Sequence, residues 1–395
     1  MKLAISDYTV SCAAGRGLKA LNESIATCRT GLRENNFSRC SLETWIGRVE
    51  GVESTELPSL CKGLMSRNNQ LAWLGLQQDG FLEAVEHVRA RISSARIGIV
   101  MGTSTSSIGR TEEGYTELDD FEAMPRAYQQ SEVHNMNSPG IFVARALGIE
   151  GPSMTISTAC SSSAKVFATA MRWINLDLVD AVIVGGVDTL CLSVLYGFNS
   201  LGLIAGSKCR PMDARRTGIN IGEAAGYALV ASENIMPNAR AFLAGYGESC
   251  DAHHMSHPHP EGEGAVLAMR AALSRAQIGP QQVGYVNLHG TATKANDFIE
   301  TIAMQRVFGE PVPASSTKGW TGHTLGAAGI LESIICLEAM RHGLLPKTLN
   351  CEQPDPKLKF PVLMKNKQVG VDYTLSNSFG FGGNNASLIF GYRHD

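Results

Sequence analysis

The sequence has no excess of positive charge, and this excludes one broad class of partner. It contains 34 Lys and Arg residues against 37 Asp and Glu residues, which gives a formal net charge of -3 at pH 7. Proteins that bind nucleic acid over a broad surface carry a surplus of cations that neutralises the phosphates. We therefore expect no nucleic-acid partner.

Long apolar runs are absent as well. No stretch of about 18 apolar residues occurs, so the sequence predicts no membrane-spanning helix. The first residues, Met1–Asp7, interrupt their apolar run at Asp7 and lack the core of a signal peptide. We expect a β-strand at this end of the chain and a cytoplasmic location.

Paired cysteines are a third absence. The ten cysteines are scattered along the chain and include no Cys-x-x-Cys pair. Their spacing favours neither a zinc knuckle nor a disulfide framework. We expect most of them to be small buried side chains.

The sequence does contain an alternation of short apolar runs and longer helical patterns, which is typical of α/β layering. Continuous apolar runs indicate a sheet covered on both faces. A Pro-Asn turn within 233–239 predicts a division into halves at 1–238 and 239–395. We expect strands at 95–101, 180–186 and 283–288, and helices at 65–93, 262–276 and 326–342.

The segment Ser157–Lys165 is the first candidate for chemistry, because it holds Cys160 among small residues. A short apolar strand over 153–156 leads into it, and a helical pattern begins at the cysteine. The unpaired N–H groups at a helix N-terminus stabilise a thiolate, which makes Cys160 a candidate nucleophile. A helix N-cap with an incidental buried cysteine explains the same segment equally well.

Two histidines lie in turns rich in Gly and Thr. His289 ends an apolar strand, and His323 stands within Thr317–Gly329. A lone histidine is more often structural than catalytic, but two of them with a cysteine at a helix start favour a Cys-His-His site. Segment 376–385 adds glycines that permit close backbone approach and aromatics that fit either a mobile gate or a tight hairpin.

Together, these segments resemble the β-ketoacyl-acyl-carrier-protein synthases of the thiolase superfamily. The resemblance spans nearly the whole chain and rests on several motifs in the family's order and spacing. Besides the cysteine loop, the histidine loops and the C-terminal segment, the motifs are Gly151-Pro152, Cys209–Arg216, Gly218–Gly226, Asn296-Asp297 and Glu300.

The resemblance implies an α/β fold of five layers, αβαβα, built from two similar halves with the active site between them. It also implies that Cys160 takes an acyl chain from a carrier-protein thioester. His289 and His323 then assist decarboxylation of a malonyl unit by stabilising the enolate oxygen. The resulting carbanion attacks the Cys160 thioester and extends the acyl chain by two carbons.

Further residues take roles from the same resemblance. The N–H groups of Phe381 and Cys160 match an oxyanion hole, and Phe381 with Phe379 matches a gating loop. Lys318 matches the family's active-site lysine, and Glu332 matches the glutamate that supports it.

The expected ligands and partners also follow from the resemblance. Thr291 and Thr293 match hydroxyls that hydrogen-bond the phosphopantetheine arm, which arrives on the carrier protein. No metal and no redox cofactor is implied. The partners are an acyl carrier protein and a second subunit, in a homodimer or in a heterodimer with a chain-length-factor-like subunit.

Two other roles exist within this fold class. A chain-length factor lacks the nucleophile and shapes the tunnel of a catalytic partner, whereas a decarboxylase form carries Gln in place of the cysteine. Cys160, both histidines and Lys318 favour the condensing enzyme over these alternatives. General similarity suggests fatty acid biosynthesis or a related polyketide pathway, such as the bacterial aryl polyene pathways. The sequence departs from its relatives at Trp320, beside Lys318, and at Asn384, where Thr is commoner.

Two segments suggest a metal site and a phosphate-binding loop, but in each the sequence favours another interpretation. Segment 251–261 holds four histidines and two acids, but we expect its prolines to keep the rings from converging on a metal. Residues Gly218–Gly222 lack the Lys-Ser/Thr pair of a phosphate loop.

Docking of an acidic carrier protein requires a local basic patch. Lys62, Arg67 and Arg210 are the candidates. Cations that are merely solvated explain each of these residues as well.

Overall fold

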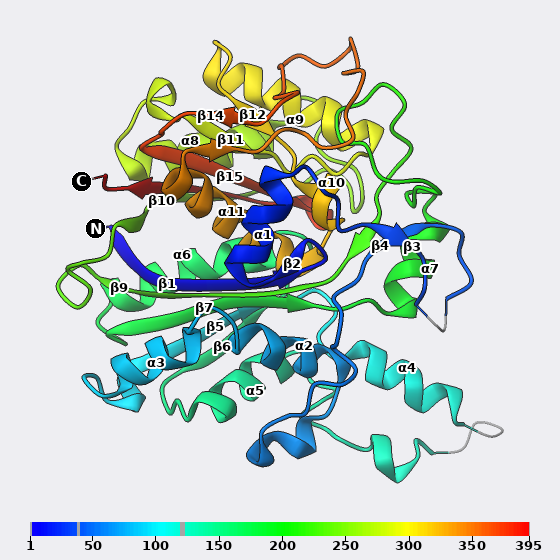
Figure 1. Ribbon diagram of the computed structural model, residues 1–395, viewed down its shortest axis with the longest axis vertical. Helices are drawn as coiled ribbons and strands as arrows, with labels where there is room; N and C mark the ends of the chain where they lie inside the picture. Colours follow the sequence, from blue (N-terminus) through cyan, green and yellow to red (C-terminus); the bar gives the residue numbers. More distant parts are fainter. Residues whose placement is uncertain (1, 38–39, 119–122, 395) are drawn as a thin grey trace.

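A mixed sheet runs through the computed structural model, which describes residues 2–37, 40–118 and 123–394 (Figure 1). Parallel and antiparallel pairs both occur in it. Across the sheet the strands follow the order β12 (Ala314–Ser315), β11 (Tyr285–Asn287), β15 (Tyr373–Gly380), β16 (Asn384–Tyr392), β10 (Ala241–Cys250), β1 (Leu3–Cys12), β9 (Ala224–Ser232), β7 (Ala181–Asp188), β5 (Ile97–Gly102) and β6 (Ser153–Ile156).

Strand β1 joins two parts of this sheet. It pairs with β9 from Leu3 to Cys12, with a bulge between Ile5 and Asp7. It pairs with β10 only over Leu3–Ile5, so the two parts separate beyond that point. One part contains β9, β7, β5 and β6, and the other contains β10, β16, β15, β11 and β12.

Helices fill the space between the two parts and cover both outer faces, which confirms the predicted five layers (Figure 1). The middle helix α11 contacts β9 on one side and β15 on the other. The middle layer holds α1 (Gly17–Ala26), α6 (Ser162–Asn175) and α11 (Ala328–His342). The outer layers hold α2 (Arg67–Leu76), α3 (Phe81–Arg89) and α5 (Ser138–Leu147) on one face, and α8 (Glu263–Ala276) and α9 (Lys294–Phe308) on the other.

Shorter elements connect the layers and carry the loops around the site. They include α4 (Ile108–Thr116), α7 (Leu192–Ser200) and α10 (Lys318–Thr321), and the strands β2 (Gly15–Arg16), β3 (Arg33–Glu34), β4 (Trp45–Gly47), β8 (Ile221–Gly222), β13 (Leu344–Leu345) and β14 (Lys367–Gln368). The 3-10 turns are η1 (Ser59–Leu64), η2 (Ser94–Arg96), η3 (Arg126–Tyr128), η4 (Pro280–Gln282), η5 (Leu325–Ala327) and η6 (Phe381–Gly383).

Continuous apolar runs form the strands that are covered on both faces, as predicted. Successive side chains of a strand point to opposite faces. In β5, Val100 faces the core between the two parts of the sheet, while Ile99 and Met101 face the outer core. Every residue of β5 and β7 is therefore buried.

The predicted strands and the predicted helices at 262–276 and 326–342 are confirmed, whereas the prediction of a single helix over 65–93 is wrong. β1 continues beyond the predicted Asp7 to Cys12. The pattern over 65–93 forms two helices, α2 and α3, because Asp79 and Gly80 both adopt positive φ angles of 56° and 71°. The Asp79 carboxylate accepts hydrogen bonds from Leu18 N and Thr9 Oγ1, which fixes the break.

The predicted boundary between the halves, at 238/239, falls in the connection between β9 and β10. It stays a prediction. Within the described part of the chain, no helix is long and apolar enough to cross a membrane.

Helix α8 lies directly on β10 because glycine lines the contact. A Cβ atom at Gly247 would meet the carbonyl oxygen of Ala268 at 1.8 Å, so α8 would have to move. We expect Gly247→Ala to lower the free energy of unfolding by about 1–3 kcal/mol, the usual cost of overpacking. The measurement is the urea midpoint.

A matched control lies in α7. A Cβ atom at Gly197 meets nothing within 4 Å. Gly197→Ala should leave the midpoint unchanged or raise it, since alanine favours a helix by up to about 1 kcal/mol. Equal loss in both variants would contradict the packing argument.

Candidate active site

Cys160 lies in a sharp turn between β6 and α6. Ala159 adopts a positive φ of 51°, which is unusual for a residue with a Cβ atom. Ser162 Oγ holds the turn by accepting from Thr158 N at 2.9 Å and donating to Ala159 O at 2.6 Å. The cysteine therefore precedes the first turn of α6, as the sequence predicts, and is 5% exposed.

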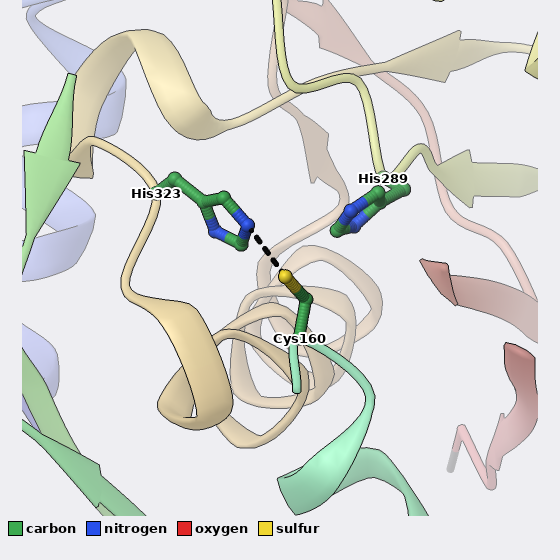
Figure 2. A group of neighbouring side chains, drawn as sticks. All are labelled: Cys160, His289 and His323. Carbon is green, nitrogen blue, oxygen red and sulfur yellow. Dashed lines mark hydrogen bonds between the residues drawn. The ribbon is translucent and has the colours of Figure 1, made fainter. Parts of the chain in front are cut away.

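His323 approaches Cys160 from the connection between α10 and η5. Its Nε2 lies 2.9 Å from Cys160 Sγ (Figure 2). Leu325 N donates to His323 Nδ1 at 3.3 Å. Because Nδ1 accepts, the proton of a neutral ring sits on Nε2 and points toward the sulfur.

His289 follows β11 and faces the same sulfur from the other side (Figure 2). Its ring centroid lies 5.4 Å from that of His323 and 6.1 Å from that of Phe379. Glu300 fixes its backbone by accepting from His289 N at 2.8 Å and from Gly290 N at 2.7 Å. The imidazole thus stands on a rigid turn at the end of a strand.

Lys318 and Glu332 form a buried ion pair behind the two imidazoles. Their side chains are 2% and 3% exposed, and Lys318 Nζ donates to Glu332 Oε1. The same ammonium donates to His289 O at 2.5 Å. One charge therefore connects the start of α10, the middle of α11 and the loop that carries His289.

Burial and this nearby positive charge keep both imidazoles neutral. Desolvation and the Lys318 ammonium lower the pKa of His289 well below its usual value, and His323 contributes in the same direction. Desolvation and Lys318 also hold the pKa of His323 well below 6.5. Burial raises the pKa of Glu332 to about 7, although Lys318 opposes the shift.

The Cys160 thiol does not have the low pKa that its helix position predicts. Burial raises the pKa of Cys160 to about 11. The Lys318 charge and the Phe381 N–H act in the opposite direction and favour the thiolate. The expected stabilisation is present, but desolvation outweighs it.

A cavity of about 510 Å³ opens onto the cysteine and both histidines. Thr291 and Thr293 line it, and their hydroxyl oxygens lie 3.0 Å apart. Lys294, at the start of α9, is exposed beside them. The predicted hydroxyl pair therefore faces the same space as Cys160.

Phe379 and Phe381 form another wall of the cavity. Phe381 directs its backbone N–H toward Cys160. Its ring packs against Phe198 with centroids 5.5 Å apart. The backbone bends at Gly382 and Gly383, whose φ angles of 76° and 73° are in the left-handed region that favours glycine.

The rings of the histidine-rich loop approach one another in pairs. The prolines do not keep the rings apart: Nδ1 of His254 lies 3.2 Å from Nδ1 of His257, and the centroids of His253 and His259 are 5.4 Å apart. Among the described residues, no third metal donor joins either pair. His254 and His257 line the cavity instead.

The three central residues are themselves a donor set. Cys160 Sγ and one nitrogen of each histidine lie within 4.8 Å of one another. A cation bound there would face the Lys318 ammonium, whose charge opposes it, because burial weakens the screening between them. The arrangement suits a nucleophile beside two polar rings better than a metal centre.

One docking candidate is wrong. Arg67 is only 14% exposed, because its guanidinium pairs with the buried carboxylate of Glu223 at 2.6 Å and with Glu53. Lys62 is exposed on η1, and Arg210 faces Glu352 at 3.6 Å. These two cations stay predictions, whereas Arg67 serves a structural ion pair.

Sequence reasoning missed the contacts that hold the Phe381 loop. Asn385 Nδ2 donates to Asp251 Oδ1 at 2.7 Å, across 134 positions of the chain. Phe198 packs on Phe381 from α7. No local pattern marks these residues, because each contact joins segments far apart in the sequence.

These observations define the class of protein. A buried Cys-His-His set between two α/β halves, at the floor of a cavity, is the arrangement of a condensing enzyme. The family model described as the beta-ketoacyl synthase N-terminal domain matches residues 69–234, and the C-terminal domain model matches residues 240–352.

The chain belongs to the beta-ketoacyl synthase family. It is 35% identical over 319 residues to 3-oxoacyl-acyl-carrier-protein synthase 2 of Vibrio harveyi, which covers 75% of this chain and 76% of the relative. It is 38% identical over 376 residues to nodulation protein E of Rhizobium meliloti, covering 88% and 90%. The protein is an acyltransferase that forms carbon–carbon bonds, a 3-oxoacyl-acyl-carrier-protein synthase.

A solved structure shares this fold over nearly its whole length. A chain of the ketosynthase complex with its chain length factor from Xenorhabdus doucetiae is 36% identical, with a TM-score of 0.86. The match covers 99% of this chain and 98% of that one. The presence of Cys160 with both histidines favours a catalytic ketosynthase over a chain length factor.

The pKa shifts predict two opposite pH dependences of stability. Below pH 6.5, His323 binds a proton in the unfolded chain but stays neutral in the folded protein. Through this group, the free energy of unfolding of the wild type falls by about 1.4 kcal/mol for each pH unit of acidification. Relative to wild type, His323→Gln should therefore gain stability as the pH falls from 6.5 to 5. Urea midpoints across this range measure the difference.

Glu332 gives the matched comparison with the opposite sign. Its folded pKa of about 7 lies above its unfolded value, so the folded state holds the extra proton between about pH 4.5 and 7. Relative to wild type, Glu332→Gln should gain stability as the pH rises through that window. Parallel curves for the two variants would contradict these assignments.

Proposed function

We propose that Cys160 is the nucleophile that accepts an acyl chain from an acyl carrier protein. Its sulfur attacks the thioester carbonyl, the bond to the carrier sulfur breaks, and the thiol proton ends on the released carrier thiol. The N–H groups of Cys160 and Phe381 stabilise the oxyanion. The observation that carries this proposal is the 2.9 Å contact between Cys160 Sγ and His323 Nε2, at the floor of the cavity.

In the second half-reaction, His289 and His323 assist decarboxylation of malonyl carrier protein. As carbon dioxide leaves, the enolate oxygen accepts hydrogen bonds from the two rings. The carbanion then attacks the acyl carbonyl on Cys160, so a carbon–carbon bond forms and the bond to sulfur breaks. Neutral rings support this role. Because Nδ1 of His323 accepts a hydrogen bond, the neutral ring carries its proton on Nε2, and this N–H can donate to the enolate oxygen.

The remaining residues prepare the site for this sequence. Lys318, held by Glu332, keeps the imidazoles neutral. Thr291 and Thr293 hydrogen-bond the phosphopantetheine arm, and Phe379 lies beside that path with the Phe381 gate. The residues of 1–238 thus supply the nucleophile, while those of 239–395 supply both histidines.

The proposed partners are an acyl carrier protein and a second ketosynthase-fold subunit. Support for the second subunit comes from β6, which ends the described sheet path and exposes 43% of Met154. A homodimer and a heterodimer with a chain-length-factor-like subunit both use such an edge. The similarity to the Xenorhabdus doucetiae ketosynthase, which was solved in complex with its chain length factor, favours the heterodimer. We propose a specialised pathway of the aryl polyene kind, rather than primary fatty acid synthesis, from the general similarity of the sequence alone.

Variants of Cys160 and His323 should affect the two half-reactions differently. Cys160→Ala should form no acyl-enzyme, because it removes the attacked sulfur. His323→Ala should still form it, while release of carbon dioxide from malonyl carrier protein falls by about 100-fold or more, the range of a lost general acid–base or oxyanion donor. Intact mass and carbon dioxide release measure the two steps.

Equal loss of both steps in His323→Ala, in a variant that unfolds at the wild-type midpoint, would refute the division of labour. Full condensation by Cys160→Ala would refute the mechanism itself.

The subunit contact has its own test. Met154→Arg places a charge on the exposed face of β6. It should prevent the assembly that the wild type forms, alone or with a chain-length-factor-like subunit, and light scattering should then give the masses of the separate chains. Met255→Arg, at a residue 77% exposed on the cavity loop, is the control and should leave the mass unchanged. A wild-type chain that is monomeric alone and pairs with a chain-length-factor-like subunit establishes the heterodimer. If Met154→Arg still forms the wild-type assembly, β6 is excluded as the contact.

A further inference from the structure

The loop that carries Phe381 has little stiffness of its own. It follows β15, passes through η6 and enters β16. Gly382 and Gly383 both adopt left-handed backbone conformations, and glycine leaves the chain more conformational freedom than any other residue. The position of the Phe381 N–H above Cys160 is therefore set by what holds the loop from outside.

One set of contacts holds the loop to the segment after β10. Gly382 N donates to Met255 O at 2.7 Å, and Asp251 N donates to Gly383 O at 2.9 Å. That segment is itself largely exposed around 252–257. Together with the pairing of Asn384 to Gly380 and Cys250, these bonds tie the loop to the sheet and to the segment after β10, but none of them joins the loop to α6.

A different contact joins the loop to α6, the helix that follows Cys160. Lys165 lies in the first turns of α6, the helix that Cys160 precedes. Its Nζ donates to Asn384 Oδ1, the residue directly after η6, at 3.1 Å. The ammonium is partly buried beneath the loop, and among the described residues the Asn384 amide oxygen is the one hydrogen-bond acceptor that it reaches.

The chemistry of this pair gives it strength. A hydrogen bond from a charged donor is stronger than one between neutral groups, and partial burial increases that difference. The positive charge of Arg172, further along α6, repels the Lys165 ammonium and lowers the pKa of Lys165. The Asn384 amide thus compensates the Lys165 charge through a direct hydrogen bond at the base of the loop, and the nearby Cys250 also favours the charged form.

We propose that Lys165 is a positioning residue that holds the Phe381 loop in its closed position and so completes the oxyanion hole above Cys160. This role rests on the proposed acyl transfer to Cys160 and extends it. Lys165 acts through Asn384 and the loop backbone and does not touch the acyl group.

The consequence for the reaction is specific. Lys165→Met keeps the length and the apolar stem of the side chain but removes the donor. Transfer of the acyl chain to Cys160 should slow by about tenfold, as expected for loss of one hydrogen bond from a charged group. The KM for acyl carrier protein should stay unchanged, because the docking surface is intact.

The test is single-turnover acylation of the full-length protein by octanoyl carrier protein, followed by intact mass. The variants are Lys165→Met, Asn384→Ala and the double variant. If one hydrogen bond carries the effect, the double variant should lose no more than either single variant. Lys165→Arg, which restores a donor, should recover most of the rate. Arg172→Met, which removes another cation from α6 where it pairs with Glu248, is the matched control and should acylate at the wild-type rate.

A second measurement does not depend on the carrier protein. An open loop exposes Cys160, so iodoacetamide should alkylate the Cys160 peptide several-fold faster in Lys165→Met than in wild type. Equal alkylation and equal acylation rates, or losses that add in the double variant, overturn the proposal. A wild-type protein that takes no acyl group from the carrier refutes the proposed function instead, while the alkylation result still decides the role of Lys165.

Discussion

The buried ammonium of Lys318 is the interaction on which the site depends. It bonds to the backbone of His289 and pairs with Glu332 on α11, and its charge adds to burial, the larger cause, in keeping both imidazoles neutral. Breaking such a buried pair typically costs about 3–5 kcal/mol, because one charge is left without compensation. That cost explains why the loops carrying the two histidines keep a fixed relation to each other.

The five layers bring the parts of this site together. Cys160 stands before α6 and Glu332 stands on α11, and both helices are enclosed between the two parts of the sheet. His289 comes from the end of a strand in the other part. Cys160 and the two rings therefore meet between the two parts of the sheet, and neither part by itself carries all three side chains.

Local patterns predicted much of this arrangement. Local sequence was sufficient around Cys160, because the strand at 153–156, the turn of small residues and the following helix are adjacent in sequence. The buried strands were predicted from their apolar runs. The failures have a common physical cause. The break between α2 and α3 depends on what Asp79 contacts in β1 and α1, and the loss of Arg67 as a docking cation depends on Glu223, 156 positions away. The raised pKa of Cys160 likewise reflects burial by distant segments, which outweighs the helix start that the sequence reveals.

The most direct test of the central claim is the protonation state of the two rings, read by nitrogen-15 NMR of labelled histidine, with single variants giving the assignments. The account predicts that His289 and His323 are neutral at pH 7, with the His323 proton on Nε2, and that Lys318→Met raises the pH at which both rings become charged. A charged His323 at pH 7, unaffected by the loss of Lys318, would contradict it.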